Sequence, residues 1–203
     1  MNDREQGPPK RPSRPWSLQV EIAAAERRNA IARGECKIDD EEGSAIDNLV
    51  LYEENLYRLA NESFETESQA YDRLHSLQGA GIPHRYAMGT VSSPSPDPGF
   101  PRPIRPSCLL LECIEECNLA TVDPKLVLRS LARDLLHTVH KLGRCGVAHA
   151  DLHESNILFA HTSAASAQLT GTPFSRAVVL DFGQALLREV HDSDEYREEI
   201  LYQ

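Results

Sequence analysis

The sequence predicts a fold of the α+β class. Residues 64–78 and about 124–143 carry apolar side chains at helical spacing, whereas residues 108–112 and 178–180 are short apolar runs with the length of buried strands. A chain of 203 residues corresponds to one domain or slightly more. With 40% hydrophobic and 26% charged residues, it is expected to be globular with some solvated segments.

The charge balance limits the partners of the chain. Its 21 basic and 31 acidic residues give a net charge of −10, which argues against binding to nucleic acid or to an anionic membrane surface. No apolar run approaches the roughly 18 residues of a membrane span, and residues 1–15 contain no secretory signal. The five cysteines are odd in number and form no C-x-x-C pair, so a reduced, cytoplasmic setting is predicted.

The first third of the chain is less clear. Residues 1–15 are rich in proline and polar groups and are predicted to be a disordered tail. Residues 16–33 fit either a strand or a helix. An acidic loop over 35–47 and a short strand over 48–52 are expected to follow.

Two boundaries are better marked. The helix over residues 64–78 should end at Gly79 and Gly81, and six prolines predict an extended solvated loop over 92–107.

The helix that begins near Asp123-Pro124 buries leucines and one valine on one face. Its other side carries a basic stripe, interpreted as a solvated face, with an anionic docking strip as the alternative: Arg129, Arg133, His137 and Lys141.

Two segments carry the chemistry, residues 147–158 and 178–183. Phosphoryl transfer needs Mg²⁺ held against phosphate oxygens and a carboxylate that orients the attacking hydroxyl. Mg²⁺ takes a few hard oxygen ligands and keeps waters. Asp151, Asn156 and Asp181 would supply such a set if the later strand brings Asp181 to the loop.

The pattern His149-x-Asp151-Leu152-x-x-x-Asn156, followed by Asp181-Phe182-Gly183, resembles the catalytic and metal-binding loops of the protein-kinase-like superfamily. The resemblance implies that Asp151 is the catalytic base or hydroxyl orienter. It also implies that Asn156 and Asp181 are magnesium ligands, and that the cofactors are ATP and Mg²⁺. The expected partners are the nucleotide and a hydroxyl-bearing substrate or a protein.

The same resemblance implies a two-lobed protein-kinase-like fold. Residues 16–112 would form a reduced N-terminal sheet lobe, with a proline-rich loop over 92–107, and residues 113–203 a shortened helical C-terminal lobe. Glu112 and Ile114 would lie at the hinge, where backbone groups meet adenine. Glu67 would be the helix glutamate that partners an ATP-contacting lysine, with a plain solvated residue as the alternative.

Several departures from the family pattern leave the activity open. The chain has neither a G-x-G-x-x-G loop nor a P-loop, and Lys37 is the only lysine between residues 10 and 125. Arg58 could supply charge there, although an arginine does not simply replace a lysine. Only 20 residues follow Gly183, so a shortened or incomplete family member is expected. A non-catalytic pseudokinase is therefore the alternative function.

His153 bears on the substrate and on a rival site. The Asp-Leu-His order at 151–153 is more similar to aminoglycoside phosphotransferases and lipopolysaccharide-type kinases, which favours a small-molecule hydroxyl acceptor. His149, Asp151 and His153, with His161 nearby, could instead hold zinc. The preferred interpretation of His149 is a buried residue whose imidazole bonds to the backbone near the loop.

Overall fold

The computed structural model describes residues 17–35, 45–97, 99, 101–161 and 173–188. Contacts divide the chain into two compact units, residues 1–60 with 90–106 and residues 61–89 with 107–203. The predicted disordered tail, residues 1–15, lies outside the described residues. The division into lobes at residues 112 and 113 stays a prediction.

The first unit contains α1 (Leu18–Ala32) and the first half of α2 (Ala45–Arg73). Helix α1 settles the ambiguity of residues 16–33 in favour of helix, and the Ser17 hydroxyl caps it by accepting from the Val20 N–H at 3.3 Å. The strand predicted over residues 48–52 is wrong, because these residues belong to α2.

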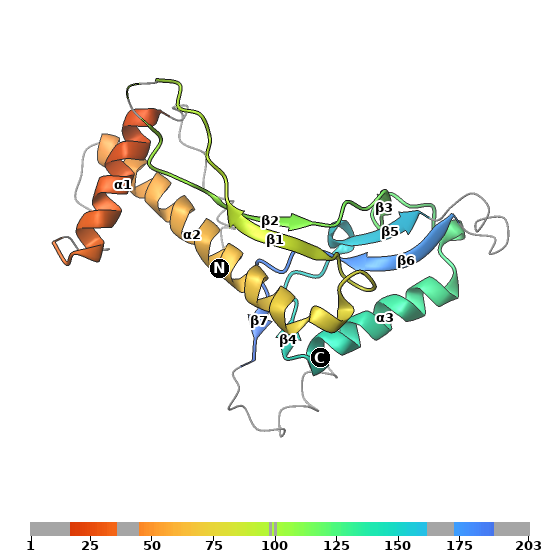
Figure 1. The fold of residues 1–203 in the computed structure, drawn as a ribbon. Helices are drawn as coiled ribbons and strands as arrows, with labels where there is room; N and C mark the ends of the chain where they lie inside the picture. Colours follow the sequence, from red (N-terminus) through yellow and green to blue (C-terminus); the bar gives the residue numbers. More distant parts are fainter. Residues whose placement is uncertain (1–16, 36–44, 98, 100, 162–172, 189–203) are drawn as a thin grey trace, which may run out of the picture. The chain divides into compact units, whose positions relative to one another are not determined.

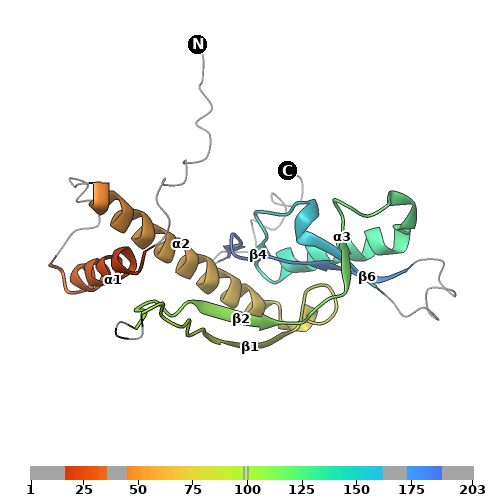
Figure 2. The ribbon, with the colours of Figure 1, turned by 90° about the horizontal axis from the view of Figure 1, so that it is seen from above.

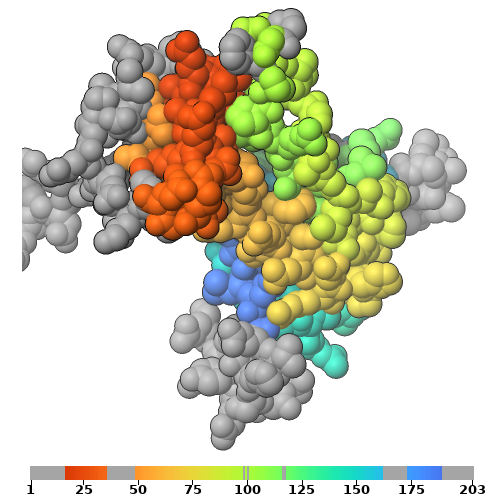
Figure 3. All heavy atoms as spheres, turned by 60° about the vertical axis from the view of Figure 1, so that its left-hand side comes forward, coloured from red at the N-terminus to blue at the C-terminus, as the bar shows by residue number. Residues whose placement is uncertain are grey.

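A buried ion pair fastens this unit. The Glu21 carboxylate on α1 has no exposed surface, and the Arg102 guanidinium donates to both of its oxygens at 2.6–3.1 Å. Arg27 on α1 pairs with Glu54 on α2 at 2.8 Å. Figure 3 shows the red surface of α1 beside the green surface of the 90–106 segment that carries Arg102.

The second unit begins within α2 and continues with short elements. They are η1 (His75–Leu77), β1 (Arg85–Thr90), β2 (Ser107–Leu111), β3 (Glu116–Asn118), η2 (Pro124–Leu126), α3 (Arg129–Arg144), β4 (Val147–Ala148), η3 (Glu154–Asn156), β5 (Ile157–His161), β6 (Phe174–Val179) and β7 (Leu186–Leu187). The described strands form three small sheets, β1–β2, β3–β5–β6 and β4–β7. The structure thus has the mixed helix and sheet content that was predicted.

Most of the predicted elements of this unit are present with shifted ends. The strand over 108–112 corresponds to β2, and the run at 178–180 to the end of β6. Strand β1 was not predicted; nearly all of its residues are exposed, so it lacks the apolar pattern of a buried strand. Asp123 caps the short η2 and not α3, which begins at Arg129.

Helix α3 lies along the β3–β5–β6 sheet (Figure 1). Strand β5 pairs antiparallel with both β3 and β6, so alternate residues of the central strand point to opposite faces. Phe159 lies on the face that packs with Leu131 of α3, whereas Leu158 lies on the face that Ile114 covers. The sheet therefore has an apolar layer on each side.

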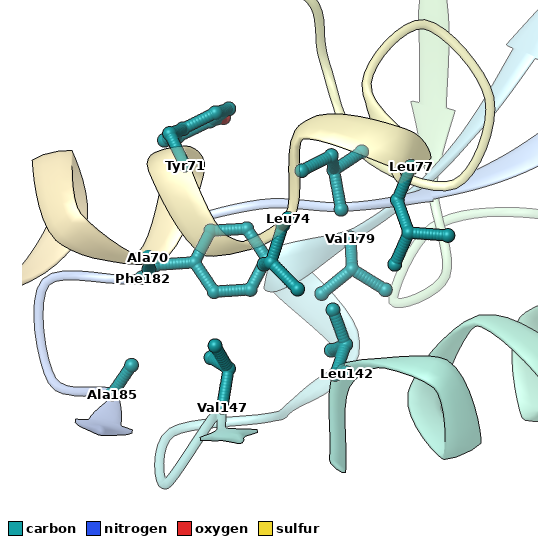
Figure 4. Packing of buried hydrophobic residues seen from close by; sticks show 10 residues of the cluster. Ala70, Tyr71, Leu74, Leu77, Leu142, Val147, Val179, Phe182 and Ala185 are labelled. Atoms are coloured by element: carbon teal, nitrogen blue, oxygen red, sulfur yellow. The ribbon is translucent and has the colours of Figure 1, made fainter. Parts of the chain in front are cut away.

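A larger core joins the last turns of α2 to the segment after β6. Figure 4 shows Phe182 and Val179 close to Leu74, the residue directly after α2, with Leu142 of α3 and Val147 nearby. The β1–β2 hairpin runs beside the same part of α2 (Figure 2), and its partly buried leucines pack against this core. The core thus fixes the residues on either side of the predicted site.

Within the described residues, no helix has the length and apolar character needed to cross a membrane. Cys108, Cys113 and Cys145 have free thiols. The cytoplasmic setting stays a prediction.

Candidate functional site

The segment between β4 and β5 carries Asp151 and Asn156. Asp151 is exposed, with 48% of its side chain accessible, in the irregular segment after β4. The amide Nδ2 of Asn156 donates to the backbone oxygen of Asp151 at 3.1 Å. This bond uses the nitrogen of the amide, so Oδ1 is the atom that Asn156 can offer to a cation.

Hydrogen bonds tie this segment to the residues after β6. The Leu180 N–H donates to the backbone oxygen of Asn156 at 2.9 Å. His149 Nε2 donates to the backbone oxygen of Leu180 at 2.7 Å. Because Asp181 follows Leu180 directly, the backbones that carry Asp151, Asn156 and Asp181 are linked to one another.

His149 is buried, with 6% of its surface exposed, and its imidazole bonds to the backbone as predicted. A carbonyl oxygen can only accept, so Nε2 carries the proton. The other ring nitrogen, Nδ1, is buried and has no hydrogen-bond partner in the described part of the chain. The ring lies 5.0 Å from the ring of Phe182. His149 therefore supports the loop that holds Asp181.

Two residues beside these bonds have unusual backbones. Ala150 has a φ of 60° and Asp181 a φ of 62°, and they are the two non-glycine residues with positive φ among those described. Such conformations cost free energy and persist where the surroundings impose them, and they are frequent at functional sites. Ala150 directly precedes Asp151, the predicted catalytic residue, and Asp181 is itself a predicted magnesium ligand.

Glu67 on α2 lies against the same loop. Burial, and after it the negative charge of Asp181, raises the pKa of Glu67 above its ordinary value. The hydrogen bond that the carboxylate accepts from the Phe182 N–H lowers this pKa and offsets only part of the rise. No lysine precedes Lys125 in the described residues, and Lys37 lies outside them. Glu67 therefore meets a second carboxylate where the family pattern has a lysine.

The two predicted hinge residues have contacts of their own. The Glu112 N–H donates to the His84 oxygen at 2.8 Å, and its carboxylate accepts from the His84 N–H at 3.1 Å and from Arg176. Ile114 packs against the apolar face of β5 and β6. Among the bonds described for this unit, none joins Glu112 or Ile114 to Asp151, so their role toward adenine stays a prediction.

Arg176 is a residue that the sequence did not single out. From β6 it pairs with Glu112 and donates to the backbone oxygens of Gly79 and of Ala80, the latter at 3.2 Å. It thereby connects the turn after α2 to the end of β2. One arginine within a strand carries no signal of this role in the sequence.

The zinc alternative is not supported. The described residues include His149, Asp151, His153 and His161, yet they contain no group of three or more His, Cys, Asp or Glu side chains arranged to hold a metal. His153 Nδ1 accepts from the Ser155 N–H at 3.2 Å, and Nε2 lies 3.8 Å from the Asp151 carboxylate.

No family model matches the chain, and no curated protein matches it. Among solved structures the chain is similar to the Rio2 kinase of Chaetomium thermophilum, determined as an ADP/Mg²⁺-phosphoaspartate complex, with 19% identity and a TM-score of 0.44. The match covers 70% of this chain and 36% of that chain, so the chain spans about a third of the kinase's length. Membership of the kinase-like superfamily and the two-lobed architecture stay predictions.

Proposed function

We propose that the chain binds Mg·ATP through Asp151, Asn156 and Asp181 and transfers the γ-phosphoryl group to a hydroxyl acceptor. The proposal is carried by the chain of hydrogen bonds from Asp151 through Asn156 to Leu180, because these bonds link the backbones on which all three side chains sit. The positive φ of Asp181 supports it, since strained backbone is expected at a functional position.

The donor set suits magnesium. Asp181 offers a carboxylate, one oxygen of which accepts from the Gly183 N–H at 3.3 Å, and Asn156 offers Oδ1. Mg²⁺ is commonly held by one or two such oxygens with waters and phosphates completing its shell. When bound, it would supply positive charge against the phosphate oxygens. Asp181 and Asn156 would orient the nucleotide, and Asp151 would accept the proton of the attacking hydroxyl.

Asp151 is accessible enough for that role. Its carboxylate is about half exposed, and Nε2 of His153, a side chain that is itself 45% exposed, lies 3.8 Å from it. A base must reach the acceptor hydroxyl directly. The exposed surroundings suit a small-molecule hydroxyl or a protein side chain as the acceptor, and the proposed partners remain the nucleotide and that acceptor.

A pseudokinase that binds nucleotide or a protein partner is the second candidate. The observation that favours it is Glu67, whose carboxylate lies near Asp181 and accepts from the backbone of Phe182. A lysine that would neutralise Glu67 and contact phosphate is missing from the described residues. Losing one preorganised charge of this kind costs on the order of 3–4 kcal/mol of transition-state stabilisation, or a rate several hundred-fold lower.

The test combines a binding measurement with a transfer measurement on the full chain. Mg·ATP at about a hundred times its dissociation constant should stabilise the fold by about 2.7 kcal/mol, and ATP without magnesium should not. Asp181→Asn should remove this stabilisation. Asp151→Asn should keep it and abolish release or transfer of labelled γ-phosphate. Asp134→Asn, an exposed position on α3, is the matched control and should change neither.

The outcomes separate the candidates. Metal-dependent stabilisation with transfer supports the phosphotransferase, and stabilisation without transfer supports the pseudokinase. If Asp181→Asn binds Mg·ATP as well as the unchanged chain does, the assignment of the site is refuted.

A further inference from the structure

The outer face of α3 is basic. Arg129, Arg133, Leu136, His140 and Arg144 step along the helix by four, three, four and four residues, so they form one stripe, and all five are exposed. We call this stripe the basic face. Leu136 lies in the middle of it with 70% of its surface accessible, the highest value among the exposed large hydrophobic residues described.

Helix stability favours Arg144 in the last turn but does not explain the charges at the start of the helix. Leu128 at the N-cap makes no side-chain cap bond, and the first turn holds no acidic residue. Arg129 places a positive charge at the helix N-terminus, where the helix dipole disfavours it. In the described part of the chain, none of the arginines of the basic face forms an ion pair. In a chain of net charge −10, this concentration of cations points to an anionic occupant.

An acidic segment of the same chain starts close to this helix. Residues 189–203 carry six acidic residues against one arginine and include the apolar pair Ile200-Leu201. These residues lie outside the part that the structure describes. Arg188, which precedes them, donates its N–H to the Gly146 oxygen at 2.9 Å, two residues beyond the end of α3.

Arg188, the last residue before the acidic segment, is held in place by hydrogen bonds. The Arg73 guanidinium donates to the backbone oxygens of both Gly146 and Arg188, at 3.3 and 2.5 Å. Fifteen extended residues span up to about 50 Å, whereas a 16-residue helix is about 24 Å long. The acidic segment is therefore long enough to follow the whole of α3. A tether of this length also gives an effective concentration in the millimolar range, so weak contacts suffice.

We propose that residues 189–203 dock on the basic face of α3 in the same molecule. The segment follows the helix from Arg144 toward Arg129, and its carboxylates face the arginines, with Glu198 and Glu199 reaching Arg133 and Arg129. Opposite charge fixes the location. This proposal is independent of the phosphotransferase function.

The experiment uses the full chain with a small dye attached at its C-terminus. Time-resolved fluorescence anisotropy reports whether the dye rotates freely or with the folded unit. At about 20 mM salt the dye should keep a high residual anisotropy, and about 1 M salt should abolish it, because the screening length shrinks to about 3 Å. The double variant R129E/R133E should show the high-salt value at low salt.

Folding and net charge are controlled separately. Glutamate is a good helix former and is favoured near a helix N-terminus, so R129E/R133E should not unfold α3, which circular dichroism verifies. The matched control R105E/K125E reverses two other exposed cations and should keep the residual anisotropy. The charge swap R129E/R133E with E198R/E199R should restore it.

Three results would overturn the proposal. The first is free rotation of the dye at every salt concentration. The second is an R129E/R133E variant with unchanged anisotropy, which would place the segment elsewhere. The third is a residual anisotropy that rises with protein concentration, which would mean that the basic face takes the acidic segment of a second copy.

Discussion

The ring of Tyr71 meets the ring of Phe182 edge to face, with centroids 5.7 Å apart and planes at 82°. Both side chains are fully buried, one on α2 and the other in the loop that carries Asp181. On its other side Phe182 contacts the His149 ring. The aromatic contact therefore connects α2 to the loop of the candidate site, in an arrangement that favours such pairs by about 0.5–1.5 kcal/mol beyond the area buried.

Tyr71→Phe should stabilise the fold. The Tyr71 hydroxyl is buried and has no hydrogen-bond partner among the described residues, so folding strips it of water without compensation. Removing it should raise the free energy of unfolding by about 1 kcal/mol, or roughly 2–4 °C in Tm, and should leave the ring contact intact. Tyr86→Phe, at a position 62% exposed, is the control and should have no effect. A lower Tm for Tyr71→Phe would mean that the hydroxyl has a partner.

Glu67→Gln should stabilise the fold at neutral pH. The pKa of Glu67 is raised by burial and by Asp181, so the folded state prefers the protonated carboxyl. The stability that the protonated Glu67 carboxyl contributes is fully present below the pKa of Glu67 in the unfolded chain. It is lost as the pH rises through the higher pKa of Glu67 in the folded chain. Glutamine keeps an oxygen for the Phe182 N–H and removes the charge. Glu67→Gln should raise the free energy of unfolding by about 1 kcal/mol at pH 7, which is the size of the interaction between two close charges in water.

The pH dependence of that gain separates the electrostatic cause from a packing effect. Thermal unfolding measured between pH 4 and 8 should show the advantage of Glu67→Gln shrinking toward acid pH. Glu65→Gln, at an exposed position of the same helix, serves as the control and should show no such trend. An advantage that is constant with pH would contradict the role assigned to the charge.

The sequence was most informative where side-chain pattern and burial coincide. The apolar run of β2 and the buried face of α3 could be predicted because core packing imposes their periodicity. The run at 48–52 could not, since a few consecutive apolar residues fit a strand or a helix equally well, and here they continue into α2. The interpretation of His149 as a buried residue whose imidazole bonds to the backbone was also correct. The contact of Glu67 with the Phe182 N–H depends on tertiary structure and has no sequence signal.

Arg176→Lys should destabilise the fold. The guanidinium reaches the Glu112 carboxylate with one nitrogen and the backbone oxygens of Gly79 and Ala80 with another. A single ammonium cannot serve both sides, so one set of partners loses its donor. The loss should be about 2 kcal/mol in the free energy of unfolding, measured by urea titration. Arg105→Lys, at an exposed position, should be neutral, and an equal effect of both variants would refute the bridging role.

Gly81→Ala should destabilise the fold because the site has no room for a methyl group. A Cβ at Gly81 would lie 2.5 Å from Oγ1 and 2.6 Å from Cγ2 of Thr138, a buried residue of α3. Because Thr138 is branched, no rotation clears both atoms, and the Gly81 backbone, which accepts from the Val179 N–H at 2.9 Å, must shift. Overpacking of this kind costs about 1–3 kcal/mol.

A second glycine and a second substitution make this prediction specific. A Cβ at Gly89 meets no atom within 4 Å, so Gly89→Ala should leave the Tm unchanged within about a degree. The double variant G81A/T138A should be less destabilised than the sum of the two single variants, because removing the threonine branches relieves the clash. Additive losses in urea titrations would show that the methyl group is accommodated without Thr138, and would contradict the packing described for this turn.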